Sequence, residues 1–179
     1  MDEPGRGEVL VAIAREAIAA LDDRGPGTWE HDWLRDHGAS FVTLRLEGEL
    51  RGCIGSVEPH RPLGDDVARN GRAAAFHDPR FTPVSRAEIA ALQVEISVLS
   101  PREAMTVASE AEALSRLRPG VDGILLEFRS LSATFLPQVW DGLPEPARFL
   151  GELRRKAGLP VAFWHPEMKL YRYTVEKYR

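Results

Sequence analysis

Residues 50–56 combine amino-acid types that support thiol chemistry. Their sequence is Leu-Arg-Gly-Cys-Ile-Gly-Ser, with Arg51 and Cys53 two positions apart. If this segment is a β-strand, both side chains point to the same face. A guanidinium beside a thiol stabilises the thiolate and lowers the cysteine pKa from its free value of about 8.5. Cys53 is therefore a candidate nucleophile with Arg51 as its cation. The alternative is a small buried core residue, a common role of free cysteines.

Two glycines flank this pair. Gly52 and Gly55 weaken a strand interior, and such glycines mark a β-bulge or the close approach of another backbone. Ile54 faces the opposite side and anchors the strand in the core. The segment is therefore expected to offer Arg51 and Cys53 to an open surface.

A second candidate segment, residues 77–81, reads His-Asp-Pro-Arg-Phe. It supplies a potential base in His77, a carboxylate in Asp78 and a cation in Arg80, on a proline-stiffened loop that follows a helix. Loops on a rigid scaffold often carry function. Two interpretations stay open: the loop orients a substrate, or an internal contact between Asp78 and Arg80 holds the loop itself.

Three further residues are candidates at strand positions. Glu95 lies on the polar face of an alternating strand, where it serves as an acid or base or is simply solvated. Pro137 ends another strand, and Gln138 and Trp140 are expected to project beyond that end. An amide beside an indole suits a planar polar ligand, and it suits a protein partner equally well.

Motifs for the common cofactors are missing from the sequence. We find no phosphate-binding glycine-rich loop, no dinucleotide fingerprint, no paired Cys-x-x-Cys and no His-Glu-x-x-His. The five histidines show no metal-ligand spacing. The sequence therefore indicates neither a metal nor a cofactor.

The periodicity of the apolar residues predicts the elements that position these candidates. Alternating segments predict strands, and apolar residues at a spacing of 3.6 predict helices. Capping boxes at Ser85/Glu88 and Ser109/Glu112 predict the start of two more helices. Strands are expected at residues 41–47, 50–57, 93–99, 124–128, 133–136 and 169–177, with further helices at 8–22, 62–76 and 146–157. Because the strands alternate, we predict an α+β fold of mostly antiparallel sheet flanked by helices, with a smaller subdomain.

Composition limits the class of protein. The chain has 179 residues, of which 44% are hydrophobic and 28% charged, which fits one domain over residues 1–179 with a core from about residue 8. The net charge of −4 argues against nucleic acid as a partner. The sequence shows no secretory signal and no transmembrane segment, and its single cysteine excludes an internal disulfide. We expect a soluble cytoplasmic protein that binds neither nucleic acid nor a membrane.

Several segments, in order, resemble the AMMECR domain family. The resemblance covers the chain from about residue 8 to its last residue. The matching segments are Leu-Arg-Gly-Cys-Ile-Gly at 50–55, Ala-Ala-Ala-Phe at 73–76, Asp-Pro-Arg-Phe at 78–81, Val-Glu-Ile-Ser-Val-Leu at 94–99, Gly-Val-Asp-Gly-Ile at 120–124, Thr-Phe-Leu-Pro-Gln-Val-Trp at 134–140, Phe-Leu at 149–150 and Lys-Ala-Gly-Leu at 156–159.

This resemblance implies a place in a multi-protein modification pathway. Prokaryotic members look like component A of the AmmeMemoRadiSam set, whose companions are a Memo-like protein and a radical-SAM protein. As an enzyme or a substrate-handling subunit, the chain would use Cys53 as nucleophile or ligand contact, with Arg51 lowering its pKa or binding an anionic group. Asp78 and Arg80 would then orient the substrate, and Glu95 would act as acid or base.

The alternative is a non-catalytic adaptor or ligand-binding module. Its docking face would be formed by Arg51 and Cys53 together with Gln138 and Trp140, and its glycines would allow a partner backbone to approach closely.

Overall fold

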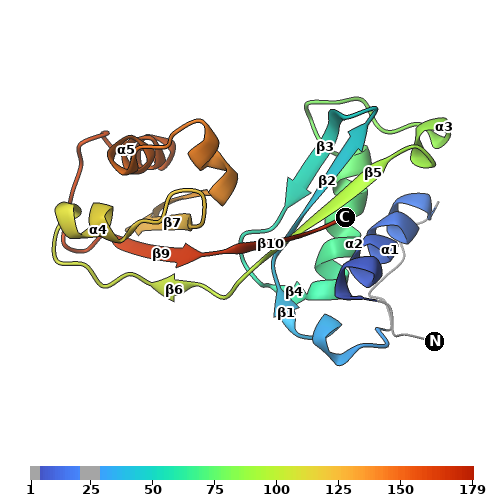
Figure 1. The fold of residues 1–179 in the computed structure, drawn as a ribbon, viewed down its shortest axis with the longest axis horizontal. Helices are drawn as coiled ribbons and strands as arrows, with labels where there is room; N and C mark the ends of the chain where they lie inside the picture. The colour runs from blue at the N-terminus through green and yellow to red at the C-terminus, as the bar shows by residue number, and fades with distance from the viewer. Residues whose placement is uncertain (1–4, 21–28) are drawn as a thin grey trace. The chain divides into compact units, whose positions relative to one another are not determined.

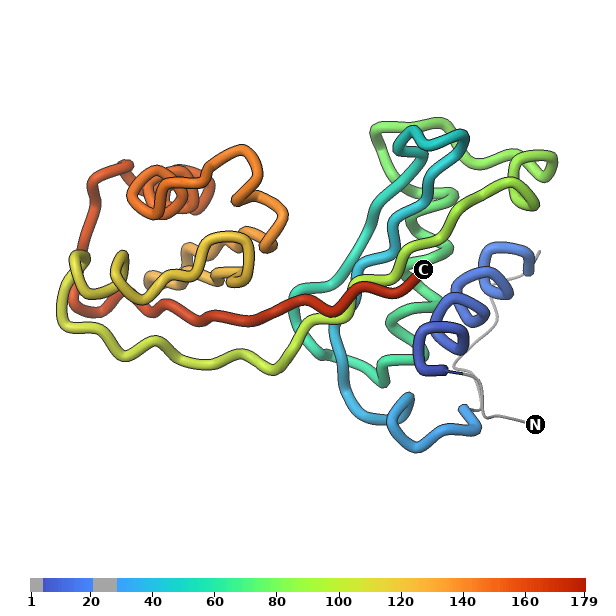
Figure 2. Tube along the Cα trace, viewed as in Figure 1, coloured from blue at the N-terminus to red at the C-terminus, as the bar shows by residue number. Residues whose placement is uncertain are grey.

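The chain divides into two compact units, each built around its own hydrophobic core (Figure 1). We describe residues 5–20 and 29–179 from a computed structural model. The first unit comprises Met1–Leu99 and Glu176–Arg179, and the second comprises Ser100–Val175. The trace in Figure 2 leaves the first unit after strand β5 (Gln93–Leu99) and returns to it with strand β10 (Val175–Tyr178).

A four-stranded sheet and two helices form the first unit. The strand order is β10-β5-β2-β3, where β2 is Ser40–Leu46 and β3 is Glu49–Gly55. Strand β2 pairs antiparallel with both β3 and β5. Helices α1 (Arg6–Ala19) and α2 (Leu63–Phe76) pack against the sheet and against each other. The smaller elements are η1 (Asp32–Leu34), β1 (His37–Gly38), β4 (Arg61–Pro62) and α3 (Arg86–Ile89).

Side-chain alternation decides which face of this sheet meets the helices. Val42 and Leu44 on β2 are completely buried, together with Ile96 on β5, in the core formed with α1 and α2. Because successive residues of a strand point to opposite faces, Phe41 and Thr43 lie on the other face, where they are half-buried. The candidate residues that pair with Thr43 on β3 and β5 therefore lie on this second, more open face.

The second unit places helix α5 (Pro146–Lys156) on another antiparallel sheet. Trp140 lies in the core of this unit, where its ring stacks on Phe149 with 3.7 Å between centroids. The other elements are β6 (Glu103–Ala104), α4 (Glu110–Arg116), β7 (Gly123–Phe128), β8 (Leu131–Phe135), η2 (Pro137–Asp141) and β9 (Lys169–Tyr173). The strand order in the sheet is β6-β9-β7-β8.

The predicted fold class is confirmed: α+β with antiparallel sheets flanked by helices. The prediction of one strand over residues 169–177 was wrong, because β9 and β10 belong to different sheets. The break lies at Thr174, whose N–H donates to Ser100 Oγ and whose carbonyl accepts the Ser100 N–H, both at 2.9 Å. These bonds replace sheet pairing at that residue.

Helix α1 ends at Ala19, earlier than the predicted residue 22, and residues 21–28 lie outside the described part of the chain. The predicted capping box of Ser85 and Glu88 opens α3. At the start of α4 half of the predicted box is present: Ser109 Oγ accepts the Glu112 N–H, but the Glu112 carboxylate accepts the Ala108 N–H in place of the Ser109 N–H. No helix in the described part of the chain is long and apolar enough to cross a membrane.

Candidate functional site

The thiol of Cys53 lies on the outer strand of the first sheet. Strand β3 has β2 on one side, and Cys53 faces Thr43 across that pair. The Cys53 Sγ and Thr43 Oγ1 are 3.4 Å apart, within hydrogen-bonding distance. Cys53 is half-buried and belongs to neither core cluster. It is thus placed on the more open face of the sheet.

Asp78 and Arg80 bind the backbone of Cys53 from the loop after α2. Asp78 Oδ2 accepts the Cys53 N–H at 2.9 Å, and Arg80 Nη2 donates to the Cys53 carbonyl at 3.2 Å. The two side chains also bind each other, with Arg80 Nε 3.0 Å from Asp78 Oδ1 and Nη2 2.7 Å from Oδ2. Asp78 and Arg80 therefore occupy the position that a further strand would take beside Cys53. The internal contact that the sequence left open is present.

Asp78 is a strongly stabilised carboxylate. Its side chain is 2% exposed, whereas that of Arg80 is 54% exposed. Hydrogen bonding from Arg80 holds the pKa of Asp78 far below its usual range, with the Cys53 N–H adding to this and burial opposing it. The same pairing raises the pKa of Arg80, and the neighbouring Cys53 side chain raises it further, against desolvation. The pair is consequently ionised at neutral pH.

Arg51 occupies a β-bulge and faces a different partner. Leu44 pairs with Gly52 and Arg45 with Leu50, so Arg51 is the extra residue of β3. Its Nε donates to Glu88 at 2.8 Å, and its Nη1 donates to the Thr82 carbonyl at 2.8 Å.

The Arg51 side chain is 15% exposed, and its hydrogen bonds lower the pKa of Glu88 to about 2, with help from Ser85. Arg51 thus fastens the loop around Thr82 and helix α3. The arginine that binds Cys53 is Arg80, which donates to the Cys53 carbonyl.

Glu95 lies in the same row of the sheet as Cys53. Thr43 faces Cys53 on β3 and Glu95 on β5, so two strand spacings, roughly 9.5 Å, separate the two backbones. The Glu95 carboxylate is 2.6 Å from Arg179 Nε and 3.9 Å from Lys177 Nζ. Glu95 is thus held by ion pairs with Lys177 in β10 and Arg179 beyond it, and no hydrogen bond or ion pair among the described residues joins it to the thiol.

Gly52 and Gly55 are both positions that another part of the chain approaches closely. A Cβ on Gly52 would lie 2.1 Å from the Ala74 carbonyl oxygen of α2, and one on Gly55 would lie 2.2 Å from the Phe41 ring. Side chains are excluded at both places by the protein itself. His77, the residue that ends α2, is exposed.

Gln138 and Trp140 belong to the second unit, in η2. Gln138 is exposed. Trp140 was expected to project beyond the strand end, but it is only 3% exposed, and its Nε1 donates to the Asp122 carbonyl at 2.7 Å. In this position the indole fills the core of its unit. The expectation was wrong because the chain enters η2 at Pro137, and η2 turns Trp140 into the core.

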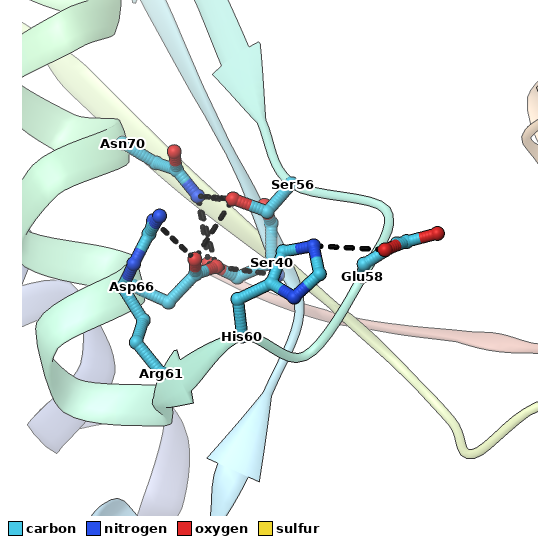
Figure 3. Close-up of polar contacts among 7 residues, drawn as sticks. All are labelled: Ser40, Ser56, Glu58, His60, Arg61, Asp66 and Asn70. Carbon is cyan, nitrogen blue, oxygen red and sulfur yellow. Dashed lines mark hydrogen bonds and ion pairs between the residues drawn. The ribbon is translucent and has the colours of Figure 1, made fainter.

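A buried polar network around Asp66, drawn in Figure 3, is absent from the candidates named in the sequence analysis. Asp66 is completely buried and accepts five hydrogen bonds, all of 2.7–2.9 Å. The donors are the N–H and Oγ of Ser40, Ser56 Oγ, Arg61 Nη1 and Asn70 Nδ2. Asn70 also donates to the Ser40 carbonyl at 2.9 Å. The network joins α2 to the start of β2 and to the segment after β3.

A sequence signal for this network does exist. Asp66 and Asn70 are four residues apart on α2 and so lie on the same helix face. When that face is buried, two such polar side chains are expected to bind each other or the same polar group. Beside the network, His60 Nε2 lies 2.8 Å from a carboxylate oxygen of Glu58, and both side chains are exposed. Among the described residues, no group of three or more His, Cys, Asp or Glu side chains is arranged to hold a metal.

The chain is similar over nearly its whole length to proteins of archaea. One from Methanothermobacter thermautotrophicus is 40% identical over 95% of this chain and 92% of its own length. One from Sulfolobus acidocaldarius is 34% identical over 97% and 81%. The crystal structure of an uncharacterized protein from Pyrococcus horikoshii matches with a TM-score of 0.82 at 34% identity, covering 96% of this chain and 89% of that one. The AMMECR1 family model matches residues 11–178, and the chain therefore belongs to the AMMECR1 family.

Proposed function

We propose that this chain is a substrate-handling subunit of a multi-protein modification pathway and that it contacts its substrate through the Cys53 thiol. The companions in this proposal are a Memo-like protein and a radical-SAM protein, as the family resemblance implies, and the pathway is placed in the cytoplasm. The proposal depends on one observation: Arg80, held by the buried Asp78, donates to the backbone carbonyl of Cys53, the residue whose thiol lies on the more open face of a sheet.

Each residue has a defined role in this proposal. Cys53 is the nucleophile or the ligand contact, and a neighbouring guanidinium favours its thiolate form. Arg80 supplies that guanidinium in place of Arg51. Asp78 is a positioning residue, because its two oxygens fix the plane of the Arg80 side chain. Thr43 orients the sulfur through its hydroxyl.

Arg51 and Glu95 have different roles from those first assigned to them. Arg51 ties the 77–83 loop to α3, so it keeps Arg80 in place from a distance. Glu95 is held in ion pairs, so the proposal assigns it no proton transfer.

The adaptor remains a second candidate, since one observation favours it. Asp78 and Arg51 direct their hydrogen bonds to the protein itself, which is what a rigid docking surface requires. An adaptor needs the shape of this surface and no reactive thiol.

The pH dependence of Cys53 alkylation tests the proposal. Cys53 is the only cysteine, so one modification is measured. We expect alkylation of the native protein with an apparent pKa clearly below about 8.5, and a higher apparent pKa in Arg80→Gln. Arg45→Gln is the matched control, since Arg45 is an exposed cation of β2 that donates to Gly48.

Two results separate the candidates. If the native thiol reacts only after unfolding, or Arg80→Gln leaves its apparent pKa unchanged, the thiol proposal is wrong. The reaction of the companion proteins with Cys53→Ser gives the second result. Loss of that reaction supports a thiol role, and full activity supports the adaptor.

A further inference from the structure

The Arg80 guanidinium has donors that the protein does not use. Of its five N–H groups, Nε binds Asp78, and Nη2 binds both Asp78 and the Cys53 carbonyl. Within residues 5–20 and 29–179, no hydrogen bond from Nη1 is present. Since the side chain is 54% exposed, these N–H groups are accessible from solvent.

The other charges near this position are already neutralised. Arg51 is paired with Glu88, and Glu95 with Arg179. The Asp78 carboxylate is 2% exposed and lies on the inner side of Arg80, where four hydrogen bonds satisfy it. An approaching molecule therefore meets the donor side of the guanidinium, and the compensating negative charge lies behind it.

We propose that Arg80 is a specificity-determining residue that binds an anionic group, a carboxylate or a phosphate, of a substrate whose reacting part lies at the Cys53 thiol. This inference rests on the proposed function and adds to it the charge of the substrate. Planar guanidinium groups that a carboxylate holds in place suit oxyanions, because their direction is fixed before the ligand arrives. A Lys at this position would keep the charge and lose that geometry.

Two small alkylating agents of equal reach test the inference without knowledge of the substrate. Iodoacetate carries a carboxylate, and iodoacetamide is its neutral counterpart. We compare their rates at a pH where Cys53 is fully ionised, so that thiol titration drops out of the ratio. Arg80 is expected to raise the iodoacetate-to-iodoacetamide ratio about two- to fivefold over that of Arg80→Gln. A full charge about 4 Å away in water would give roughly fivefold, and Asp78 offsets part of it.

The outcomes distinguish this inference from the proposed function. If Arg80→Gln raises the apparent pKa of the thiol and leaves the ratio unchanged, anion binding is wrong and the thiolate role of Arg80 stands. If the ratio falls in Arg80→Gln and stays at the wild-type value in Arg45→Gln, the inference is supported.

A second measurement needs no variant and keeps the test valid if Arg80→Gln does not fold. Inorganic phosphate is added to the wild-type protein at constant ionic strength. We expect saturable slowing of iodoacetamide alkylation, and no slowing by an equal ionic strength of chloride. Equal behaviour of the two salts would contradict the inference.

Discussion

Replacing Asp78 by Asn removes the charge that orders the Cys53 edge of the sheet. The carboxylate accepts four hydrogen bonds, one from the Cys53 N–H and three from Arg80, while 2% of its side chain is exposed. An Asn amide has a single acceptor oxygen and turns an NH₂ toward these donors. Breaking a buried ion pair costs about 3–5 kcal/mol, but Arg80 is half exposed and regains water. We therefore expect Asp78→Asn to lose about 2–3 kcal/mol.

The pH dependence of this loss follows from the depressed pKa of Asp78. The folded protein holds this carboxyl ionised to a lower pH than the unfolded chain, whose pKa is about 3.8. The stabilisation is complete above the unfolded value and is lost as the pH falls toward the folded one. The difference between wild type and Asp78→Asn is therefore constant from pH 6 to 8, and it shrinks below about pH 4.

Urea denaturation at several pH values measures this difference, with Trp29 and Trp33 as fluorescent reporters in the first unit. Hydrogen exchange of the Cys53 amide gives a local reading, since Asp78 is its acceptor. The matched control is Asp32→Asn, which breaks an exposed ion pair with Arg35 and should change stability by less than about 0.5 kcal/mol. An Asp78→Asn variant as stable as this control at pH 7, or unchanged exchange at Cys53, would refute the reasoning.

Three further substitutions are informative. Gly52→Ala places a Cβ against the Ala74 carbonyl and should cost about 3 kcal/mol in denaturation. Its control is Gly142→Ala, whose Cβ would lie 3.9 Å from the Val139 carbonyl oxygen and should be nearly neutral. Asp66→Asn leaves five donors without their carboxylate, and we expect a loss of about 3 kcal/mol together with faster exchange at the start of β2. Trp140→Ala should lower stability by about 3–5 kcal/mol and leave the alkylation rate of Cys53 unchanged; a stable variant would contradict its place in the core.

Local sequence rules predicted most of the fold, because they depend on nearest neighbours along the chain. The alternation of β2 and β5 and the capping residue Ser85 all correspond to what the structure contains. The rules failed where a distant residue decides. The polar contact between Ser100 and Thr174 splits the predicted final strand, and nothing within residues 169–177 marks that position.

The candidate site shows the same division. Periodicity placed Cys53 and Glu95 on strands, and a contact between Asp78 and Arg80 was one of the two interpretations of the loop motif. The choice between two arginines as the neighbour of the thiol was beyond sequence rules. A bulge redirects Arg51 toward Glu88, and bulges depend on the register with the adjacent strand rather than on the residue types alone.

The chain order of the two units has a consequence for biosynthesis. Strand β10 completes the sheet of the first unit beside β5, yet the whole second unit, residues 100–175, is translated between them. At ordinary ribosomal speeds this interval is on the order of ten seconds. During that time β5 has an unpaired edge, and Glu95 lacks Arg179 and Lys177. The nascent first unit therefore has a sheet edge to which a strand of another molecule can add. Until β10 has been translated, chaperone binding at this edge competes with aggregation.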